Sequence, residues 1–350
     1  MRFISIFTMV TSLGVIATVN ANIKQNNSAM PVISDNQLYE LHETSALAEH
    51  IWSRLTSEFV SQFEAGQYIE AVNTAQIAYD LAERSFGTNH INTADSILKL
   101  GIANESLGNF TQAKENMIGA LVILEEELGP MHEDVAVVYT NLANLEFEQS
   151  NQRESEKYHI EALKIRQFHF GDNDSSVAQS MYNLAVLYDD THEYKKAKTF
   201  YEHALKIWHK SYGTTHPYIA NALNNLANVH STMGDNDGAV KIHKHSLEVR
   251  RRLYGSIHPE VARSLINLGK LYVKISAYEN AKPIYTEAVN VAEKLFGSNH
   301  PQVAMLLYSL ANIYHIQGRM DSSKMNATKV SSVSGPNKKL ENLKAVSQEY

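Results

Sequence analysis

Residues 213–234 read GTTHPYIANALNNLANVHSTMG, and residues 255–276 read GSIHPEVARSLINLGKLYVKIS. The two stretches share a glycine, a His-Pro pair and an Asn-Leu-Ala or Asn-Leu-Gly triplet at the same relative positions. They begin 42 residues apart, so the sequence repeats itself with a fixed period. A period of this length is typical of proteins built from stacked supersecondary units, and it therefore decides the fold class.

The same period extends along most of the chain. Glycines recur every 42 residues, at Gly87, Gly129, Gly171, Gly213, Gly255 and Gly297. Three residues after each glycine stand His90, His132, Asp174, His216, His258 and His300. Small residues keep the same spacing at Ala71, Ala113, Ser155, Ala197, Ala239, Ala281 and Ser323. This recurrence predicts about seven structurally equivalent units.

Each unit contains two stretches with helical periodicity. Ile219, Leu223 and Leu226 fall on one face of a helix, which is expected to end at Gly234. A second amphipathic helix is expected over residues 235–254. One such hairpin cannot bury its own apolar face, so the units must stack on one another. The sequence predicts an all-α solenoid of about seven helical hairpins.

The shared pattern is Gly-x-x-His-Pro-x-(Ile/Val)-Ala-x-x-Leu-x-Asn-Leu-(Ala/Gly)-x-(Leu/Val)-Tyr. It resembles the tetratricopeptide repeat (TPR), and the 42-residue period is similar to that of the kinesin-light-chain type. The resemblance covers residues 48–333 and implies a right-handed superhelix with the first helices lining its concave surface. The repeats are expected at residues 48–89, 90–131, 132–173, 174–215, 216–257, 258–299 and 300–333, followed by a tail at 334–350.

The N-terminus has the order of a secretory signal peptide. Arg2 precedes a mostly apolar run over residues 3–19, and Val19-Asn20-Ala21 offers small residues for cleavage. This order indicates a signal peptide at residues 1–21 and a polar lead-in at 22–47. The alternatives are an uncleaved anchor and an apolar start without a targeting role. No later stretch is apolar enough to span a membrane. The mature chain is therefore expected to be secreted or periplasmic.

Composition excludes several kinds of function. The 350 residues include 31 Lys+Arg, 38 Asp+Glu and no Cys, for a net charge of −7. This acidic balance argues against a nucleic-acid binder, which usually carries a basic excess. Without cysteine there is no thiol nucleophile, thiolate metal site or disulfide.

Motifs for catalysis or metal binding are also weak. The recurring histidines stand on equivalent helices about 8–10 Å apart, too far to share a metal ion, so a helix-start role is the preferred interpretation. Ser96 and Lys99 match a Ser-x-x-Lys spacing without the companion motifs of serine acylases. We expect no enzymatic activity, no cofactor and no metal.

A polar stripe on the first helix of each unit is the candidate binding surface. In the fifth unit its members Asn221, Asn224, Asn225 and Asn228 follow the helical period. Equivalent positions elsewhere give Asn141, Asn144, Tyr182, Asn183, Arg263, Asn267, Lys270 and Lys274. The resemblance implies that these residues face a groove, where amides suit the N–H and C=O groups of an extended peptide. For the asparagine of each Asn-Leu-Ala triplet, a purely structural role stays open.

The expected function is a non-catalytic protein–protein interaction scaffold that binds an extended peptide. The charged members of the stripe, Arg263, Lys270 and Lys274, are all basic although the chain is acidic, so an acidic partner is expected. The alternative is a structural protein that self-assembles through its ends or its convex face, as a homo-oligomer.

Overall fold

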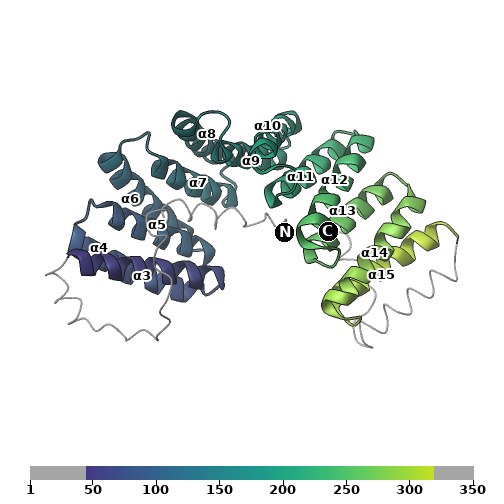
Figure 1. Ribbon diagram of the computed structural model, residues 1–350, viewed down its shortest axis with the longest axis horizontal. Coiled ribbons are helices and arrows are strands. Elements are labelled where there is room, and N and C mark those ends of the chain that lie inside the picture. Colours follow the sequence, from purple (N-terminus) through teal and green to yellow (C-terminus); the bar gives the residue numbers. More distant parts are fainter. Residues whose placement is uncertain (1–44, 319–350) are drawn as a thin grey trace. The chain divides into compact units, whose positions relative to one another are not determined.

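The structure is a computed structural model that describes residues 45–318. These residues form 13 α-helices. They divide into two compact units, residues 45–180 and 181–318, with the boundary inside one helix between Ser180 and Met181. In each unit the helices follow one another as hairpins (Figure 1), and successive helices pack together from α3 to α8 and from α10 to α15.

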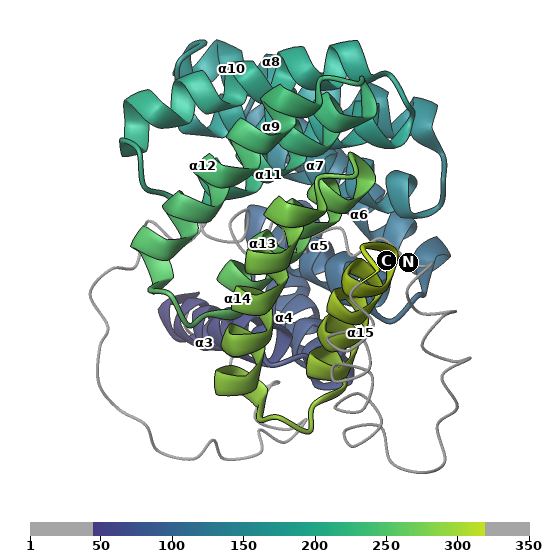
Figure 2. The same ribbon diagram turned by 90° about the vertical axis from the view of Figure 1, so that its right-hand side faces the viewer.

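The helices alternate in length, as a two-helix repeat requires. From α4 to α15, first helices have 16 residues and second helices have 19. The first unit contains α3 (Ser45–Glu64), α4 (Tyr68–Phe86), α5 (Ile91–Ser106), α6 (Phe110–Leu128), α7 (Glu133–Glu148), α8 (Gln152–Phe170) and the start of α9 (Ser175–Asp190). The second contains the rest of α9, α10 (Tyr194–Tyr212), α11 (Pro217–Thr232), α12 (Asn236–Tyr254), α13 (Pro259–Lys274), α14 (Tyr278–Phe296) and α15 (Pro301–Ile316). Figure 2 shows α11 to α14 of the second unit. The predicted all-α hairpin fold is confirmed.

The recurring histidines cap the first helices. In five repeats the imidazole Nδ1 accepts a hydrogen bond from the backbone N–H two residues later, at 3.1–3.3 Å. The residues that do this are His90, His132, His216, His258 and His300. Asp174 does the same with its carboxylate, at 2.7 Å from the nitrogen of Ser176. Each cap satisfies a helix N–H that would otherwise lack a partner, so the predicted helix-start role is confirmed.

An aromatic ring from the preceding helix holds several of these imidazoles in place. The rings of Tyr212 and His216 stack with centroids 4.0 Å apart, and those of Tyr254 and His258 with centroids 4.3 Å apart. Residues 45–318 contain no group of three or more His, Cys, Asp or Glu side chains arranged to hold a metal ion.

Small residues bring neighbouring helices close together. Ala113, Ala197 and Ala239 near the start of second helices are fully buried. At Gly269 in α13 an added Cβ would lie 2.9 Å from the ring of Tyr285 in α14, closer than ordinary contact allows. The periodic small residues therefore set the helix spacing, as expected from their recurrence.

Several sequence-based expectations concern residues outside 45–318. They are the signal peptide at 1–21, most of the lead-in at 22–47, the second helix of the last repeat and the tail at 334–350. The first helix begins at Ser45, just before the expected start at residue 48. None of the helices between residues 45 and 318 combines the length and apolarity that a membrane crossing needs.

The cap at His216 should make stability depend on pH. Burial lowers the pKa of His216 from 6.5, so the unfolded chain binds the proton more readily than the folded chain. The stabilisation that the His216 cap contributes is therefore fully present well above pH 6.5, and it is lost as the pH falls below 6.5. Asparagine caps a helix without titrating. Between pH 8 and 5.5, urea unfolding should show the parent losing up to about 1 kcal/mol more than His216→Asn; equal losses would contradict this cap mechanism.

Candidate functional site

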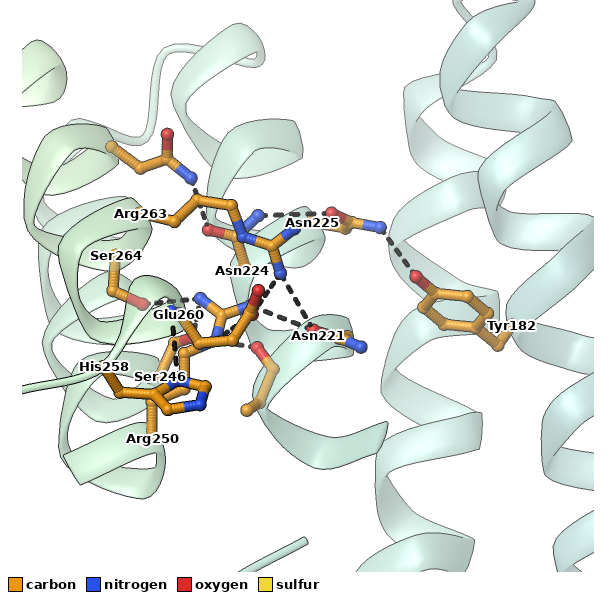
Figure 3. A network of polar contacts seen from close by, with 12 residues as sticks. Tyr182, Asn221, Asn224, Asn225, Ser246, Arg250, His258, Glu260, Arg263 and Ser264 are labelled. Atoms are coloured by element: carbon orange, nitrogen blue, oxygen red, sulfur yellow. Dashed lines mark hydrogen bonds and ion pairs between the residues drawn. The ribbon is translucent and has the colours of Figure 1, made fainter. Parts of the chain in front are cut away.

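Three amides of the predicted stripe bond to one another across neighbouring helices. Asn225 Nδ2 donates to the Tyr182 hydroxyl at 3.0 Å, and Asn224 Nδ2 donates to Asn225 Oδ1 at 3.3 Å. Asn267 Nδ2 donates to Asn224 Oδ1 at 2.8 Å. Figure 3 shows Asn224, Asn225 and Tyr182 in this chain of hydrogen bonds. This chain of hydrogen bonds joins the first helices α9, α11 and α13. The hydrogen bonds of Asn225 and Asn267 favour the structural role that the sequence left open for them. Asn224 makes hydrogen bonds of the same kind.

The chain ends on an aromatic cluster. The Tyr182 ring lies 5.6 Å from that of Tyr201 and 5.7 Å from that of Trp208, centroid to centroid. Burial raises the pKa of Tyr182 to about 12, so its hydroxyl keeps its proton at neutral pH. Tyr182 thus serves as a fixed polar anchor for α11.

A buried arginine from a second helix lies behind the same stripe. Arg250 of α12 is 1% exposed, and its Nη2 donates to Asn221 Oδ1 at 2.9 Å. Its Nη1 donates to Ser264 Oγ, and its Nε lies 3.2 Å from Glu260 Oε2 (Figure 3). Burial lowers the pKa of Arg250 to about 10, while the negative charge of Glu260 opposes that shift. Arg250 and Glu260 form a connection between α12 and α13 that sequence analysis missed.

Arg263 is exposed but already has an acidic partner. Its guanidinium pairs with Glu260 and lies 3.5 Å from Asn221 Oδ1. The charged members of the predicted stripe are basic, but Glu260, which is not one of them, lies between Arg250 and Arg263. The two other basic residues of the stripe, Lys270 and Lys274, lie further along α13.

Four of the predicted residues line one open pocket of about 290 Å³, formed by α11, α12 and α13. They are Asn228, Asn267, Lys270 and Lys274. Ser231, His243 and Leu271 complete the lining and were not predicted. The lining therefore contains two lysines and no acidic residue.

The polar groups of this pocket are oriented by the protein. Lys274 Nζ donates to the Ser231 carbonyl oxygen at 3.0 Å and to its hydroxyl at 2.8 Å. Burial lowers the pKa of Lys270, because the pocket wall removes water from its ammonium group. His243 is 2% exposed, and burial together with the charge of Arg250 lowers its pKa to about 4. At neutral pH the imidazole of His243 is therefore uncharged beside the two lysines.

The other predicted residues lie elsewhere. Asn141 is 1% exposed, and its Nδ2 donates to the Val137 carbonyl oxygen of its own helix at 2.9 Å. Asn144 is half-buried on the same helix, α7, in the other unit. Asn183 in α9 is buried. None of the three lines the pocket, and the burial of Asn141 favours its structural role.

Comparison with protein families agrees with this architecture. The sequence profile described as Tetratricopeptide repeat matches residues 61–117, 97–167, 134–208, 176–244, 218–294 and 276–332. The chain belongs to the tetratricopeptide repeat family. TPR domains are usually non-catalytic scaffolds for protein–protein interaction, and protein partners are therefore indicated. A search of curated proteins gives no match.

Solved TPR structures share the fold at low sequence identity. BtubC (BKLC) from P. vanneervenii is 23% identical with a TM-score of 0.56, covering 66% of this chain and 91% of its own. A putative kinesin light chain from Podosopora anserina with nearly identical TPR-like repeats is 19% identical, with a TM-score of 0.52. The match covers 58% of this chain and 96% of that structure. The STAND protein PH0952 from Pyrococcus horikoshii, which has a TPR sensor, is 17% identical, with a TM-score of 0.68. The match covers 90% of this chain and 45% of that structure. The structural neighbours of this TPR protein thus include kinesin-light-chain-like repeats.

Removing the charge of Glu260 should reveal how much this TPR chain depends on it. Glu260→Gln leaves the Arg250 guanidinium buried without a counter-charge, so the free energy of unfolding should fall by about 1–3 kcal/mol. Glu248→Gln is the matched control, since Glu248 pairs with Arg252 on the surface and the pair is more than half exposed. That change should cost less than about 1 kcal/mol. Equal effects in urea unfolding would show that Glu260 does not stabilise Arg250.

Proposed function

We propose that this chain is a non-catalytic interaction scaffold that binds an extended acidic segment of a protein partner at the pocket of α11, α12 and α13. The observation that carries the proposal is the lining of that pocket, which holds Lys270 and Lys274 and no acid. The whole chain has a net charge of −7, so a local basic lining is not explained by composition.

The chemistry of the two lysines supports a carboxylate ligand. An ammonium group has three N–H donors, and the two bonds from Lys274 to Ser231 leave one for a ligand. Lys270 lines the same pocket, where its ammonium group would donate a charge-assisted hydrogen bond to a carboxylate. Such bonds are stronger in a partly enclosed pocket than on an open surface.

The surrounding amides support an extended peptide backbone beside that carboxylate. Asn228 is exposed at the pocket, and Asn267 also lines it while bonding to Asn224. Because the hydrogen bonds among Asn224, Asn225 and Asn267 fix the helix positions, the pocket is organised before a ligand arrives. Preorganisation of this kind lowers the entropy cost of binding.

Replacing the two lysines tests this function. A fluorescein-labelled peptide with three central glutamates should bind the parent, and Lys270→Ser with Lys274→Ser should weaken binding by about 1–3 kcal/mol in fluorescence anisotropy. The salt dependence of binding should decrease as well, because two cationic contacts are gone.

The matched control replaces two exposed lysines of α12, Lys241→Ser with Lys244→Ser, which do not line the pocket. The control variant should bind like the parent, and a glutamine version of the peptide should bind weakly to all three proteins. If the Lys270 and Lys274 variant binds the glutamate peptide as tightly as the parent does, the site lies elsewhere.

We also propose that the scaffold works outside the cytoplasm. The support is the order of Arg2, the apolar run over residues 3–19 and the small residues before Asn22. N-terminal sequencing of the protein from its native source should find a start at or within a few residues of Asn22. Recovery of Met1 from a cytosolic pool would contradict this location.

A further inference from the structure

The chain has a second buried arginine in the same repeat position as Arg250. Arg166 of α8 precedes Arg250 by 84 residues, which is two repeats. It is 8% exposed and makes corresponding contacts inside the unit of residues 45–180. Its Nη1 donates to Ser180 Oγ, and its Nη2 donates to Thr140 Oγ1 at 3.0 Å. Ser180 is the equivalent of Ser264, so the two guanidinium groups occupy similar frameworks.

The two sites differ in charge compensation. Arg250 has Glu260 at 3.2 Å, and the residue equivalent to Glu260 beside Arg166 is Ser176. Among residues 45–318, Arg166 has hydroxyl partners and no carboxylate partner. Burial lowers the pKa of Arg166 to about 10. A guanidinium that is buried without a counter-ion is costly, so an anion at this place would be bound favourably.

The hydroxyl groups around Arg166 leave one donor for such an anion. Thr140 Oγ1 donates to the Ala136 carbonyl oxygen at 2.8 Å, and Ser180 Oγ donates to the Ser176 carbonyl oxygen at 3.3 Å. Ser176 Oγ is buried and has no hydrogen-bond partner in the described part of the chain. By its position in the repeat, Ser176 replaces Glu260, so the Arg166 guanidinium and an unpartnered hydroxyl are expected where the other site holds a carboxylate.

Access to this position is indicated by the Arg250 site. There the side chain of Glu260 is 30% exposed while it contacts the buried arginine, so a carboxylate at this repeat position extends from the arginine toward solvent. Ser176 at the equivalent position is half-buried, although its Oγ is covered. We propose that Arg166 and Ser176 form a binding site for one carboxylate group supplied by another molecule. The carboxylate belongs either to an acidic side chain of a polypeptide or to a small free acid. A carboxylate is favoured because the same framework already holds one at Arg250.

The test follows the Arg166 side chain itself in the full chain. With 15N-labelled arginine, the Nε–H signal of Arg166 is assigned by its loss in Arg166→Met. Titration with acetate, at constant ionic strength set by chloride, should shift this signal and saturate. Ser176→Ala should weaken the acetate affinity by about tenfold, since a hydrogen bond to a charged group is lost.

Ser176→Glu is the decisive variant, because it supplies the carboxylate that Glu260 provides in the other site. An acid in the first turn of a helix is favourable, and circular dichroism checks that the variant folds. Its Arg166 signal should lie near the acetate-bound position without ligand and should not respond to acetate. An unshifted Arg166 signal in the parent, or an unchanged acetate titration in Ser176→Glu, would overturn the proposal.

Two capped tripeptides identify the source of the carboxylate. Saturation by Ala-Glu-Ala but not by Ala-Gln-Ala supports an acidic side chain as ligand, and saturation by acetate alone supports a small free acid. The Lys270→Ser and Lys274→Ser variant should retain the Arg166 response, because those lysines lie in the other unit. Carboxylate binding at Arg166 and peptide binding at the pocket of α11, α12 and α13 are therefore tested independently.

Discussion

Every helical hairpin of this chain has an apolar face that only the next hairpin can cover. Burial of that face requires a constant helix spacing, and the periodic small residues provide it: Ala113, Ala197 and Ala239 are fully buried where a larger side chain would push the helices apart. Histidine caps fix the start of five first helices, and Asp174 caps α9. Because the helix spacing is the same in each repeat, a single repeat position can be occupied by side chains of different chemistry.

One buried position of the second helices illustrates that freedom. Along the chain it is occupied by Ala82, Leu124, Arg166, Trp208, Arg250 and Ala292, all of them buried. Where it is arginine, the guanidinium reaches the first helices of its own repeat and the next one. A charge placed there must find a partner, because the interior stabilises it less than water does. Glu260 supplies that partner at Arg250, whereas among residues 45–318 Arg166 hydrogen-bonds to two hydroxyl groups and pairs with no carboxylate.

The sequence predicted features that depend on periodicity. The hairpins, the histidine caps and the small contact residues follow from spacing within one repeat, and the structure confirms them. The polar stripe was predicted by position, but its hydrogen bonds were not. Asn224 bonds to Asn267 of the next repeat. The helical period of the sequence predicts which face carries Asn224, but it does not predict which side chain of a neighbouring repeat Asn224 contacts.

The pocket and the contacts of the buried arginines depend on packing between helices, which the sequence pattern did not predict. Lys270 and Lys274 could be found from the stripe, whereas Ser231 and His243 come from other faces and join the pocket only through packing. A charged residue such as Arg250 normally indicates a surface position, so its burial was unexpected. The recurrence of arginine at two equivalent positions was the one signal that could have revealed it.

The pocket of α11, α12 and α13 presents Lys270 and Lys274 in a lining that contains no acidic residue, and we propose that it binds a carboxylate. A crystal structure of the chain with a bound glutamate-rich peptide tests it most directly. We expect a peptide carboxylate about 2.7–3.2 Å from the ammonium of Lys270 or Lys274, within hydrogen-bond distance. A peptide bound to the outer faces of the second helices, with the pocket of α11, α12 and α13 empty, would contradict it.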